Sequence, residues 1–395
     1  MIKKPNNIMK NRNLARIYWF NQSFQWFATG LLLPVMTLVQ LDKGLSLADV
    51  GLSLAIYSAM TILFELPTGG LADAIGRRRV FLTSVTVTFF AALALLLANS
   101  LIGVMFSFAL LGAARALMSG TIDAWFVDTY QKQAPEEDLQ PIFAKLGIFV
   151  TLALGVSSLL GGYLPQTELA LYIAEKTWAD QYSLNLLSIM FLMICQMGLT
   201  LWLVKEPKEN HGEQGILNGL KAFPSIISDA ATFGVKNKHV LALVISSSMW
   251  CFAIAGVEML WQPQVRDIAA EEYSTVMLGY LGAGYFLFAA VGNALATPFS
   301  RLFRFNHAKL LTVMRLFMGG ALIALAVSNT LYLFALCYWL LFLINGVKES
   351  PHTAMFNKAI PSDKRSTLLS FESFAMQIGG LLGSLILALP LSINR

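Results

Sequence analysis

The sequence GGLADAIGRRR, residues 69–79, decides how the rest of the chain is interpreted. It lies between two long apolar segments and ends in three consecutive arginines, Arg77, Arg78 and Arg79. Basic residues at the ends of apolar spans collect on the cytoplasmic side of a membrane. Glycine permits a tight turn, and Asp73 can pair with Arg77 or cap the start of a helix. The stretch therefore predicts a short cytoplasmic loop between two membrane-spanning helices.

Composition indicates the same class of protein. The 395 residues are 56% hydrophobic and 13% charged, and their mean hydropathy is +0.63, whereas soluble domains carry about 25% charged residues. The net charge of +5 comes from basic residues at the ends of apolar runs, a pattern of membrane topology rather than of a nucleic-acid-binding face. The three cysteines lie inside apolar segments and have no metal-binding spacing. We therefore expect no cofactor, no metal site and no nucleic-acid partner.

Eleven apolar runs are long enough to cross a bilayer, which takes about 20 residues. They lie at about 15–40, 49–70, 80–99, 101–130, 141–164, 183–204, 239–262, 275–300, 309–328, 331–359 and 366–390. The longest polar segment divides them, so the predicted domains are an N-terminal six-helix bundle (1–204), a cytoplasmic linker (205–237) and a C-terminal bundle (238–395) with five detected helices. The first run is too long for a signal peptide, so we expect it to be retained.

The loop carries the pattern Gly-x-x-x-Asp-x-x-Gly-Arg-Arg in Gly69, Asp73, Gly76, Arg77 and Arg78. This pattern resembles the signature loop between helices 2 and 3 of the major facilitator superfamily (MFS) of secondary transporters. The resemblance implies an all-α polytopic membrane protein with two pseudo-symmetric helical bundles around a central cavity, and a gating role for this loop. The family normally has twelve helices. The absent twelfth implies a naturally short chain, a truncated one, or two spans merged in the count.

Ionisable side chains at membrane depth are the first candidates for function, because each costs several kcal/mol to bury. Arg115 is followed five residues later by Gly120, which resembles a helix 4 motif of the family and implies a role in proton transfer. Asp123 lies about 12 Å further along the same helix, so we expect the partner of Arg115 on helix 1 or 2. Structural bracing is the alternative for each charged residue. The candidate proton-coupling residues are Arg115, Glu65, Asp123, Glu349 and Glu372.

Polar and aromatic side chains at helical spacing outline a candidate substrate cavity. On helix 7, Glu258 shares a side with Trp250 and Trp261, and a carboxylate beside an aromatic wall suits a lipophilic cation; an interfacial aromatic belt is the alternative. Lys348 is expected to pair with Glu372 as a brace of the inner gate, or as a structural ion pair. The candidate cavity residues are Gln22, Gln25, Trp26, Ser58, Thr61, Trp250, Glu258 and Lys348.

The direction of transport is suggested by residues 157–162 on helix 5, Ser-Ser-Leu-Leu-Gly-Gly. They resemble the Gly-Pro-x-x-Gly-Gly ending of a motif found in the family's proton-coupled exporters. Both final glycines are present, but Ser157 and Ser158 replace the Gly-Pro, and ordinary small-residue packing is the alternative. Asp128 is expected to be structural, with an arginine of the loop as its partner.

No P-loop and no hydrolase or redox motif occurs in the sequence, so we expect no enzyme. The sequence favours a proton-coupled exporter of small amphipathic compounds or drugs that works by alternating access. Its expected partners are a small-molecule substrate, protons and the lipid bilayer. We expect a monomeric, multi-pass protein of the plasma (inner) membrane with a cytoplasmic N-terminus. The alternatives are a transporter of a specific metabolite, such as a siderophore or sugar, and a non-transporting receptor or scaffold.

Overall fold

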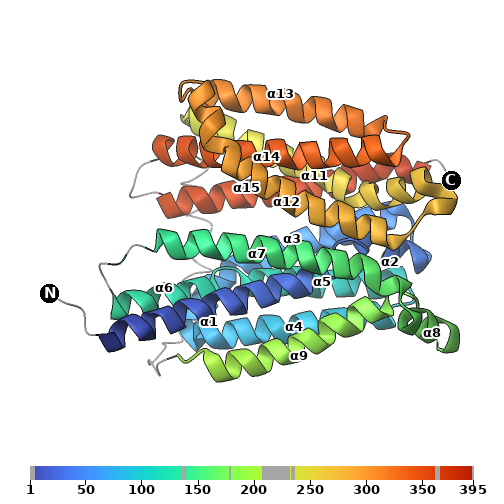
Figure 1. Cartoon of the computed structure of the whole chain (residues 1–395), viewed down its shortest axis with the longest axis horizontal. Coiled ribbons are helices and arrows are strands. Elements are labelled where there is room, and N and C mark those ends of the chain that lie inside the picture. The colour runs from blue at the N-terminus through green and yellow to red at the C-terminus, as the bar shows by residue number, and fades with distance from the viewer. Residues whose placement is uncertain are drawn as a thin grey trace.

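The computed structural model describes residues 5–134, 137, 139–177, 179–206, 232, 236–360 and 365–393. Within these ranges every regular element is a helix, so the expected all-α class is confirmed. The helices run side by side along the long axis of the molecule in two layers (Figure 1). One layer holds α1 to α9 and the other holds α11 to α15.

The first layer is made from the N-terminal half of the chain. Its helices are α1 Pro5–Gly30, α2 Met36–Asp42, α3 Leu47–Ile75, α4 Arg77–Leu97, α5 Leu101–Met118, α6 Thr121–Gln133, α7 Gln140–Tyr163, α8 Glu168–Lys176 and α9 Ser183–Leu203. The second layer consists of α11 Lys238–Ala269, α12 Thr275–Leu302, α13 His307–Ala326, α14 Leu331–Ala359 and α15 Arg365–Ile393. Ten helical segments in the described part of the chain are long and apolar enough to cross a membrane.

The first predicted span is the exception. The sequence predicts one helix over about 15–40, but the structure has α1 and α2 separated by a turn at residues 31–35, and α1 is not among the ten apolar segments. Pro34 lies in this turn, where the lack of a backbone N–H prevents the helix from continuing unbroken. The first span is therefore a broken helix.

The expected loop at 69–79 is shorter than predicted. Helix α3 continues to Ile75 and α4 begins at Arg77, so Gly76 alone separates them, with φ of +96°. Only glycine adopts this backbone conformation readily. The backbones of Gly69 and Asp73 lie in α3, and the Asp73 side chain is outside the described part of the structure. The family pattern thus corresponds to a one-residue break between two long helices.

The fourth predicted span is also broken. The sequence predicts a continuous helix over 101–130, but α5 ends at Met118 and α6 begins at Thr121. Gly120 has φ of +70°, the left-handed region in which glycine ends helices. The break places Arg115 in the last turn of one helix and Asp123 in the first turn of the next.

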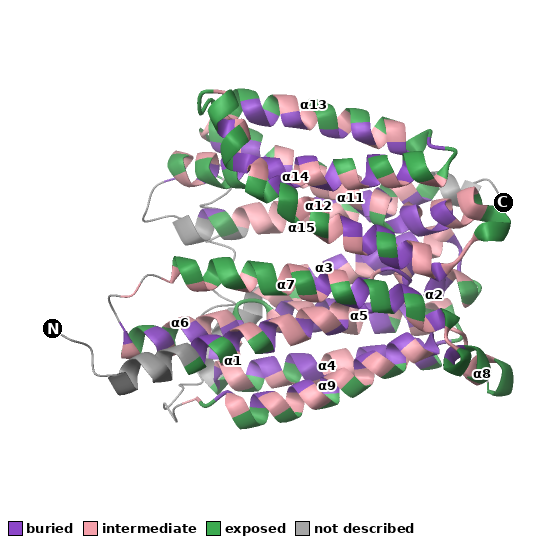
Figure 2. Cartoon of the chain, viewed as in Figure 1, coloured by how far each residue is buried: buried purple, intermediate pink, exposed green. Residues whose placement is uncertain are grey.

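The two layers meet through α3 with α15 and through α7 with α12. At the second contact the backbones approach closely, because a Cβ added to Gly162 would lie 2.6 Å from the backbone N of Gly279. Buried residues lie in the interior of each layer and between the layers, and exposed residues cover much of α13 and α7 (Figure 2). Many exposed side chains on these helices are apolar, such as Leu316 and Phe317, as expected for helices that face lipid.

The layers are joined at the end of the molecule that carries α2, here called the far end; the opposite end, with Gly76 and the N-terminus, is the loop end (Figure 1). At the far end, Gln262 of α11 accepts a hydrogen bond from the Thr37 amide at 2.9 Å and donates to the Leu33 carbonyl at 2.9 Å. Thr275 of α12 donates to the Gly162 carbonyl at 2.6 Å. Polar contacts between helices of different layers therefore close the far end.

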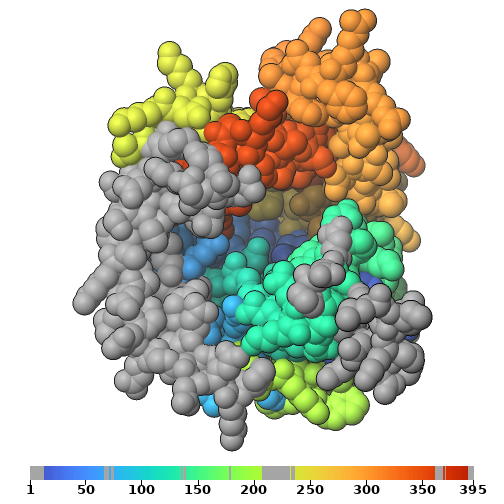
Figure 3. Space-filling view, turned by 90° about the vertical axis from the view of Figure 1, so that its left-hand side faces the viewer, coloured from blue at the N-terminus to red at the C-terminus, as the bar shows by residue number. Residues whose placement is uncertain are grey.

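A looser ion pair lies outside these hydrogen bonds. Arg266 of α11 is 3.9 Å from Asp42, at the end of α2. Burial raises the pKa of the Asp42 carboxyl, while Gln181 and Arg266 act in the opposite direction. Viewed from the loop end, the molecule is hollowed between the two layers (Figure 3). The described structure is thus closed at the far end and open at the loop end.

Candidate functional site

Arg115 is held at the end of α5 by groups from two other helices. Its guanidinium lies 5.3 Å from the ring centroid of Trp26 on α1. It is also within hydrogen-bonding reach of the Tyr57 hydroxyl and within electrostatic reach of the Glu65 carboxylate, both on α3. The free carbonyls of a helix C-terminus favour a cation as well. These contacts from α1 and α3 are the partners expected on helices 1 and 2.

Asp123 has a separate set of partners. Its Oδ1 accepts hydrogen bonds from the Tyr18 hydroxyl and from Gln22 Nε2, each at 2.6 Å. The N-terminus of α6 adds a favourable dipole, since Asp123 lies in the first turn of that helix. These interactions tie the start of α6 to α1. Gln22, expected to line the cavity, is therefore engaged with Asp123 in this state.

Glu258 of α11 occupies the inner side of the far-end closure. Its side chain is exposed, although Gln262, one turn further toward the far end, is buried. Three tyrosines lie within electrostatic reach of the carboxylate: Tyr57 from the first layer, and Tyr285 and Tyr338 from the second. The carboxylate thus faces open space at the closed end of the hollow, surrounded by aromatic side chains from both layers.

The aromatic wall differs from the predicted one. Trp261 is buried and stacks on Tyr338 with 5.3 Å between ring centroids. Trp250 instead lies beneath Lys348, whose Nζ is 5.8 Å from the ring centroid. The side chains around Glu258 are therefore tyrosines from α3, α12 and α14, elements that a helical wheel of α11 alone cannot identify.

The expected pair between Lys348 and Glu372 is wrong. Lys348 Nζ is 3.3 Å from Glu349 Oε2, and the two side chains are 5% and 57% exposed. Glu372 Oε1 instead lies 2.6 Å from His352 Nε2. Lys348 points toward Trp250 of α11, whereas Glu372 reaches α14 one turn nearer the loop end. The Glu349 side chain is largely exposed and lies within electrostatic reach of Arg315 of α13.

The remaining cavity candidates on α1 and α3 are buried. Thr61 donates to the Tyr57 carbonyl at 2.9 Å and to the Gly112 carbonyl at 3.3 Å, which joins α3 to α5. Ser58 is buried close to Gly380 of α15, and Gln25 is buried with its Oε1 unpartnered among the described residues. Thr61 therefore holds helices together, and Ser58 lies at the contact between α3 and α15.

The signature residues form a bonded cluster at the loop end. Arg77 makes an ion pair with Asp128, which confirms the expected pairing of Asp128 with an arginine of the loop. Glu206 accepts hydrogen bonds from the amides of Arg77 at 2.8 Å and Arg78 at 3.1 Å. This carboxylate caps the start of α4. A Cβ on Gly76 would lie 2.7 Å from Glu206 Oε2, so glycine also leaves room for the cap.

Sequence reasoning missed Glu206, Tyr57, His352 and Ser247. Tyr57 lies one residue before the cavity candidate Ser58, and nothing in the sequence alone directs its hydroxyl toward Arg115. Glu206 lies just after the sixth span, where a lone acidic residue has no sequence partner nearby. Their roles depend on contacts between different segments; the contacts of Glu206 with Arg77 and of Tyr57 with Arg115 join residues more than 50 positions apart in the chain.

Comparison with known proteins identifies the family. The model of the Major Facilitator Superfamily matches residues 18–384. The chain belongs to this family. It is 24% identical over 389 residues to the uncharacterized MFS-type transporter YxaM of Bacillus subtilis (strain 168), covering 94% of this chain and 87% of YxaM. It is 23% identical over 220 residues to the inner membrane transport protein YajR of Escherichia coli (strain K12), covering 54% and 44% of the two chains.

Solved structures share the fold. The crystal structure of the nucleoside transporter NupG superposes with a TM-score of 0.69 and 14% identity, over 95% of this chain and 90% of that one. A bacterial homolog of the human lysosomal transporter Spinster, in an inward-facing and unoccupied conformation, gives 0.70 and 17%, over 97% and 82%. The chain therefore has the MFS fold, and it is a multi-pass membrane protein of the MFS transporter type.

Proposed function

We propose that this transporter exports small amphipathic cations in exchange for protons, by alternating access from a cytoplasmic loop end to an external far end. The observation that carries the proposal is the exposed carboxylate of Glu258 at the closed end of the hollow. An exposed carboxylate in a cleft with low-dielectric walls raises the local concentration of cations. Aromatic faces add a further attraction of about 0.5–2 kcal/mol each.

The charges around the hollow support a cationic substrate. Glu349 adds a second exposed carboxylate on α14, and its partner Lys348 is buried against Trp250 rather than presented to the hollow. On the opposite layer, the Arg115 cation is already neighboured by Trp26, Tyr57 and Glu65. Among the described side chains of the second layer, Glu258 and Glu349 are thus two exposed carboxylates that favour a cation.

The closure supports alternating access. The far-end contacts of Gln262 and Thr275 join α11 and α12 to the first layer without covalent links. If these hydrogen bonds break and the loop end closes, Glu258 becomes accessible from the far end. Proton exchange in this cycle is assigned to carboxylates inside the helical layers. One of them is Glu65, which lies within electrostatic reach of Arg115. The Arg77–Asp128 pair holds the loop-end cluster together while the layers move.

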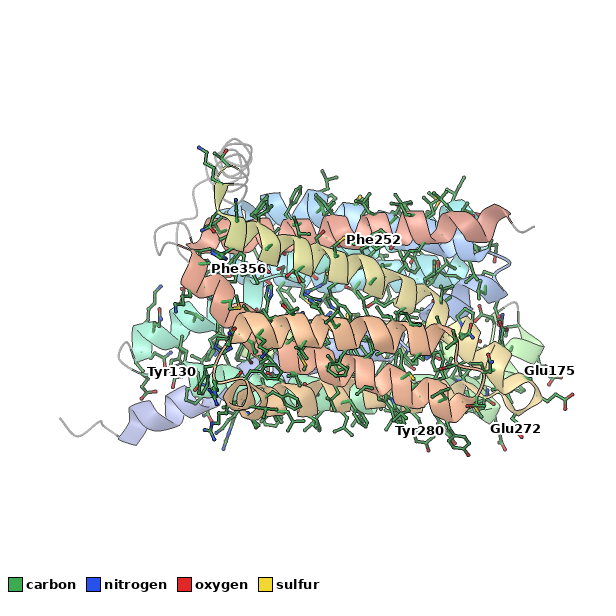
Figure 4. The ribbon with its side chains drawn as sticks, turned by 90° about the horizontal axis from the view of Figure 1, so that it is seen from above. Tyr130, Glu175, Phe252, Glu272, Tyr280 and Phe356 are labelled. Atoms are coloured by element: carbon green, nitrogen blue, oxygen red, sulfur yellow. The ribbon has the colours of Figure 1, made fainter. Side chains whose placement is uncertain are left out.

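The test is proton flux in sealed liposomes that contain the purified protein and an internal pH indicator. Tetraphenylphosphonium is the first probe, because it is a lipophilic cation without donors or acceptors. The expected result is dissipation of an imposed pH gradient when the probe is added, with a rate roughly tenfold lower in Glu258→Gln, as for the loss of about 1.4 kcal/mol. Glu272→Gln is the matched control, because Glu272 is exposed at the far end (Figure 4).

Two results would contradict the proposal. Equal rates in Glu258→Gln and Glu272→Gln would remove Glu258 from the substrate site. No flux in the unmodified protein with any of several lipophilic cations would reject cation export and direct the search to metabolites.

A further inference from the structure

Three polar side chains from three different helices meet in the second layer, near the loop end. They are Ser247 of α11, His352 of α14 and Glu372 of α15. His352 Nε2 is 2.6 Å from Glu372 Oε1, Ser247 Oγ donates to the same oxygen at 2.8 Å, and Ser247 Oγ is 3.1 Å from Nε2. The side chains of His352 and Glu372 are 7% and 12% exposed. We propose that His352 and Glu372 form a proton-binding site that couples proton uptake to the position of α14.

The proposal places one proton on His352 Nε2. In that tautomer Ser247 Oγ and His352 Nε2 both donate to Oε1 of Glu372. The other ring nitrogen, Nδ1, is buried and has no hydrogen-bond partner among the described residues. Its lone pair is a free acceptor for one further proton. The pair has a charge of −1 without this proton and is neutral with it.

The proton changes the strength of the link between helices. With a neutral imidazole, the bond from Nε2–H to Glu372 is assisted by one charge; with an imidazolium, donor and acceptor are both charged. The second charge adds a direct attraction between imidazolium and carboxylate, which is stronger in the protein interior than in water. Proton uptake from water should therefore tighten α14 against α15, and release of the same proton to water should loosen it.

The surrounding helices make α14 the element that moves. Helix α15 is locked to α11 by backbone contact, because a Cβ on Gly379 would lie 2.1 Å from the Ser248 carbonyl and a Cβ on Gly383 would lie 2.3 Å from the Phe252 carbonyl. Helix α14 contains Pro351 immediately before His352. Proline removes one hydrogen bond of the helix and permits a bend there. The pair thus connects a rigid α11–α15 unit to the segment of α14 beyond its proline.

The other charged and titratable groups on the surrounding helices lie near one another. On α14, Lys348 and Glu349 pair one turn away. Arg315 of α13 and Cys251 of α11 are within electrostatic reach of that pair. On α3, which packs against α15, Glu65 lies in reach of Arg115 of α5. Phe356, one turn beyond His352, stacks on the imidazole with 6.3 Å between centroids and shields its loop-end side.

This inference rests on the proposed proton coupling, so its first test uses no substrate. Infrared difference spectra of the purified full chain are recorded through a pH titration. A carboxylate stretching band that shifts when the imidazole takes up its proton in the unmodified protein should disappear in Glu372→Gln and stop shifting in His352→Gln, and it should behave normally in the control Glu272→Gln. Ser247→Ala keeps both titrating groups but removes one donor, so it should move the midpoint of the signal without abolishing it. This milder variant serves if His352→Gln fails to fold.

The second test separates coupling from substrate binding. In liposomes with tetraphenylphosphonium, His352→Gln should lower gradient-driven flux roughly tenfold, about 1.4 kcal/mol, while exchange of labelled for unlabelled probe at equal pH stays within about twofold. A signal that survives unchanged in His352→Gln, or in Ser247→Ala where that variant serves instead, would overturn the shared site. Loss of exchange together with driven flux would overturn a role in coupling. A titration that behaves as expected in a protein that moves no cation would refute the proposed substrate and leave the proton site standing.

Discussion

Replacing Gly162 by alanine should prevent the far end from closing. Gly162 of α7 faces α12 so closely that a Cβ would lie 2.6 Å from the Gly279 nitrogen, 2.6 Å from the Thr275 carbonyl oxygen and 2.7 Å from the Gly279 Cα. All three are backbone atoms, so no side-chain rotation relieves the contact. The helices must separate by about 0.8 Å to restore 3.4 Å, the lower limit of ordinary contact.

The magnitude follows from the cost of overpacking. Inserting a methyl group into a well-packed contact costs about 1–3 kcal/mol. Separation also stretches the 2.6 Å bond from Thr275 to the Gly162 carbonyl. Because only the far-end-closed state contains this contact, the whole cost shifts the balance between the two states. The ratio of closed to open forms should fall about 5- to 150-fold.

The assay is labelling of Thr37→Cys by a membrane-impermeant maleimide in a protein without its native cysteines. Thr37 is fully buried at the far-end closure, so the label reports opening. Gly155→Ala is the matched control, because the same substitution on the same helix meets nothing within 4 Å. Labelling should be at least about fivefold faster with Gly162→Ala than with Gly155→Ala. Equal rates would refute the reasoning that this contact closes the far end.

Three further results are expected. Asn185→Ala should lower the free energy of unfolding by about 2 kcal/mol, measured by thermal unfolding in detergent, because Nδ2 bonds the buried Leu31 and Gly161 carbonyls at 2.9 and 2.7 Å; a midpoint as in Ser188→Ala would contradict this. Glu206→Gln should speed hydrogen exchange of the Arg77 and Arg78 amides roughly tenfold, the effect of about 1.4 kcal/mol, and unchanged exchange would reject the cap. Since burial raises the pKa of Asp42 above 3.8, the folded state binds this proton more tightly than the unfolded state. Stability relative to Asp42→Asn should therefore fall as pH rises from about 3.8 through the folded pKa, and parallel profiles would exclude this titration.

The sequence predicts the broad architecture because hydropathy and loop charge are local properties. Runs of about 20 apolar residues locate the spans, and the pattern around Gly76 identifies the family before any contact is known. The breaks at residues 31–35 and at Gly120 were not predicted. Glycine and proline are common in membrane helices, so their presence alone does not distinguish a kink from a packing site.

The candidate site is less predictable, because its geometry depends on which helices face one another. Helical spacing placed Glu258 beside Trp250 and Trp261, whereas the surrounding aromatic groups are tyrosines of three other helices. Lys348 and Glu372 were paired by charge and depth alone. In the structure each has a different partner, since the rotation of α14 directs Lys348 to α11 and His352 to α15.

The two serines at 157–158 show how one motif supports two interpretations. A Cβ on Gly30 of α1 would lie 1.9 Å from Ser157 Oγ, and a Cβ on Gly282 of α12 would lie 2.2 Å from Ser158 Oγ. The serines therefore fill the contacts of α7 with one helix of its own layer and one of the other layer. Small-residue packing accounts for their size, and the direction of transport stays a proposal.

Gly120 divides the fourth span into two helical segments, α5 and α6, that can change orientation separately. Arg115 connects α5 to α1 and α3, and Asp123 connects α6 to Tyr18 and Gln22 of α1. Rotation of one helix need not rotate the other, because no continuous series of helical hydrogen bonds runs through Gly120. Probes attached to α5 and to α6 would therefore report different movements during one transport cycle. A single movement averaged over the whole span would describe neither helix.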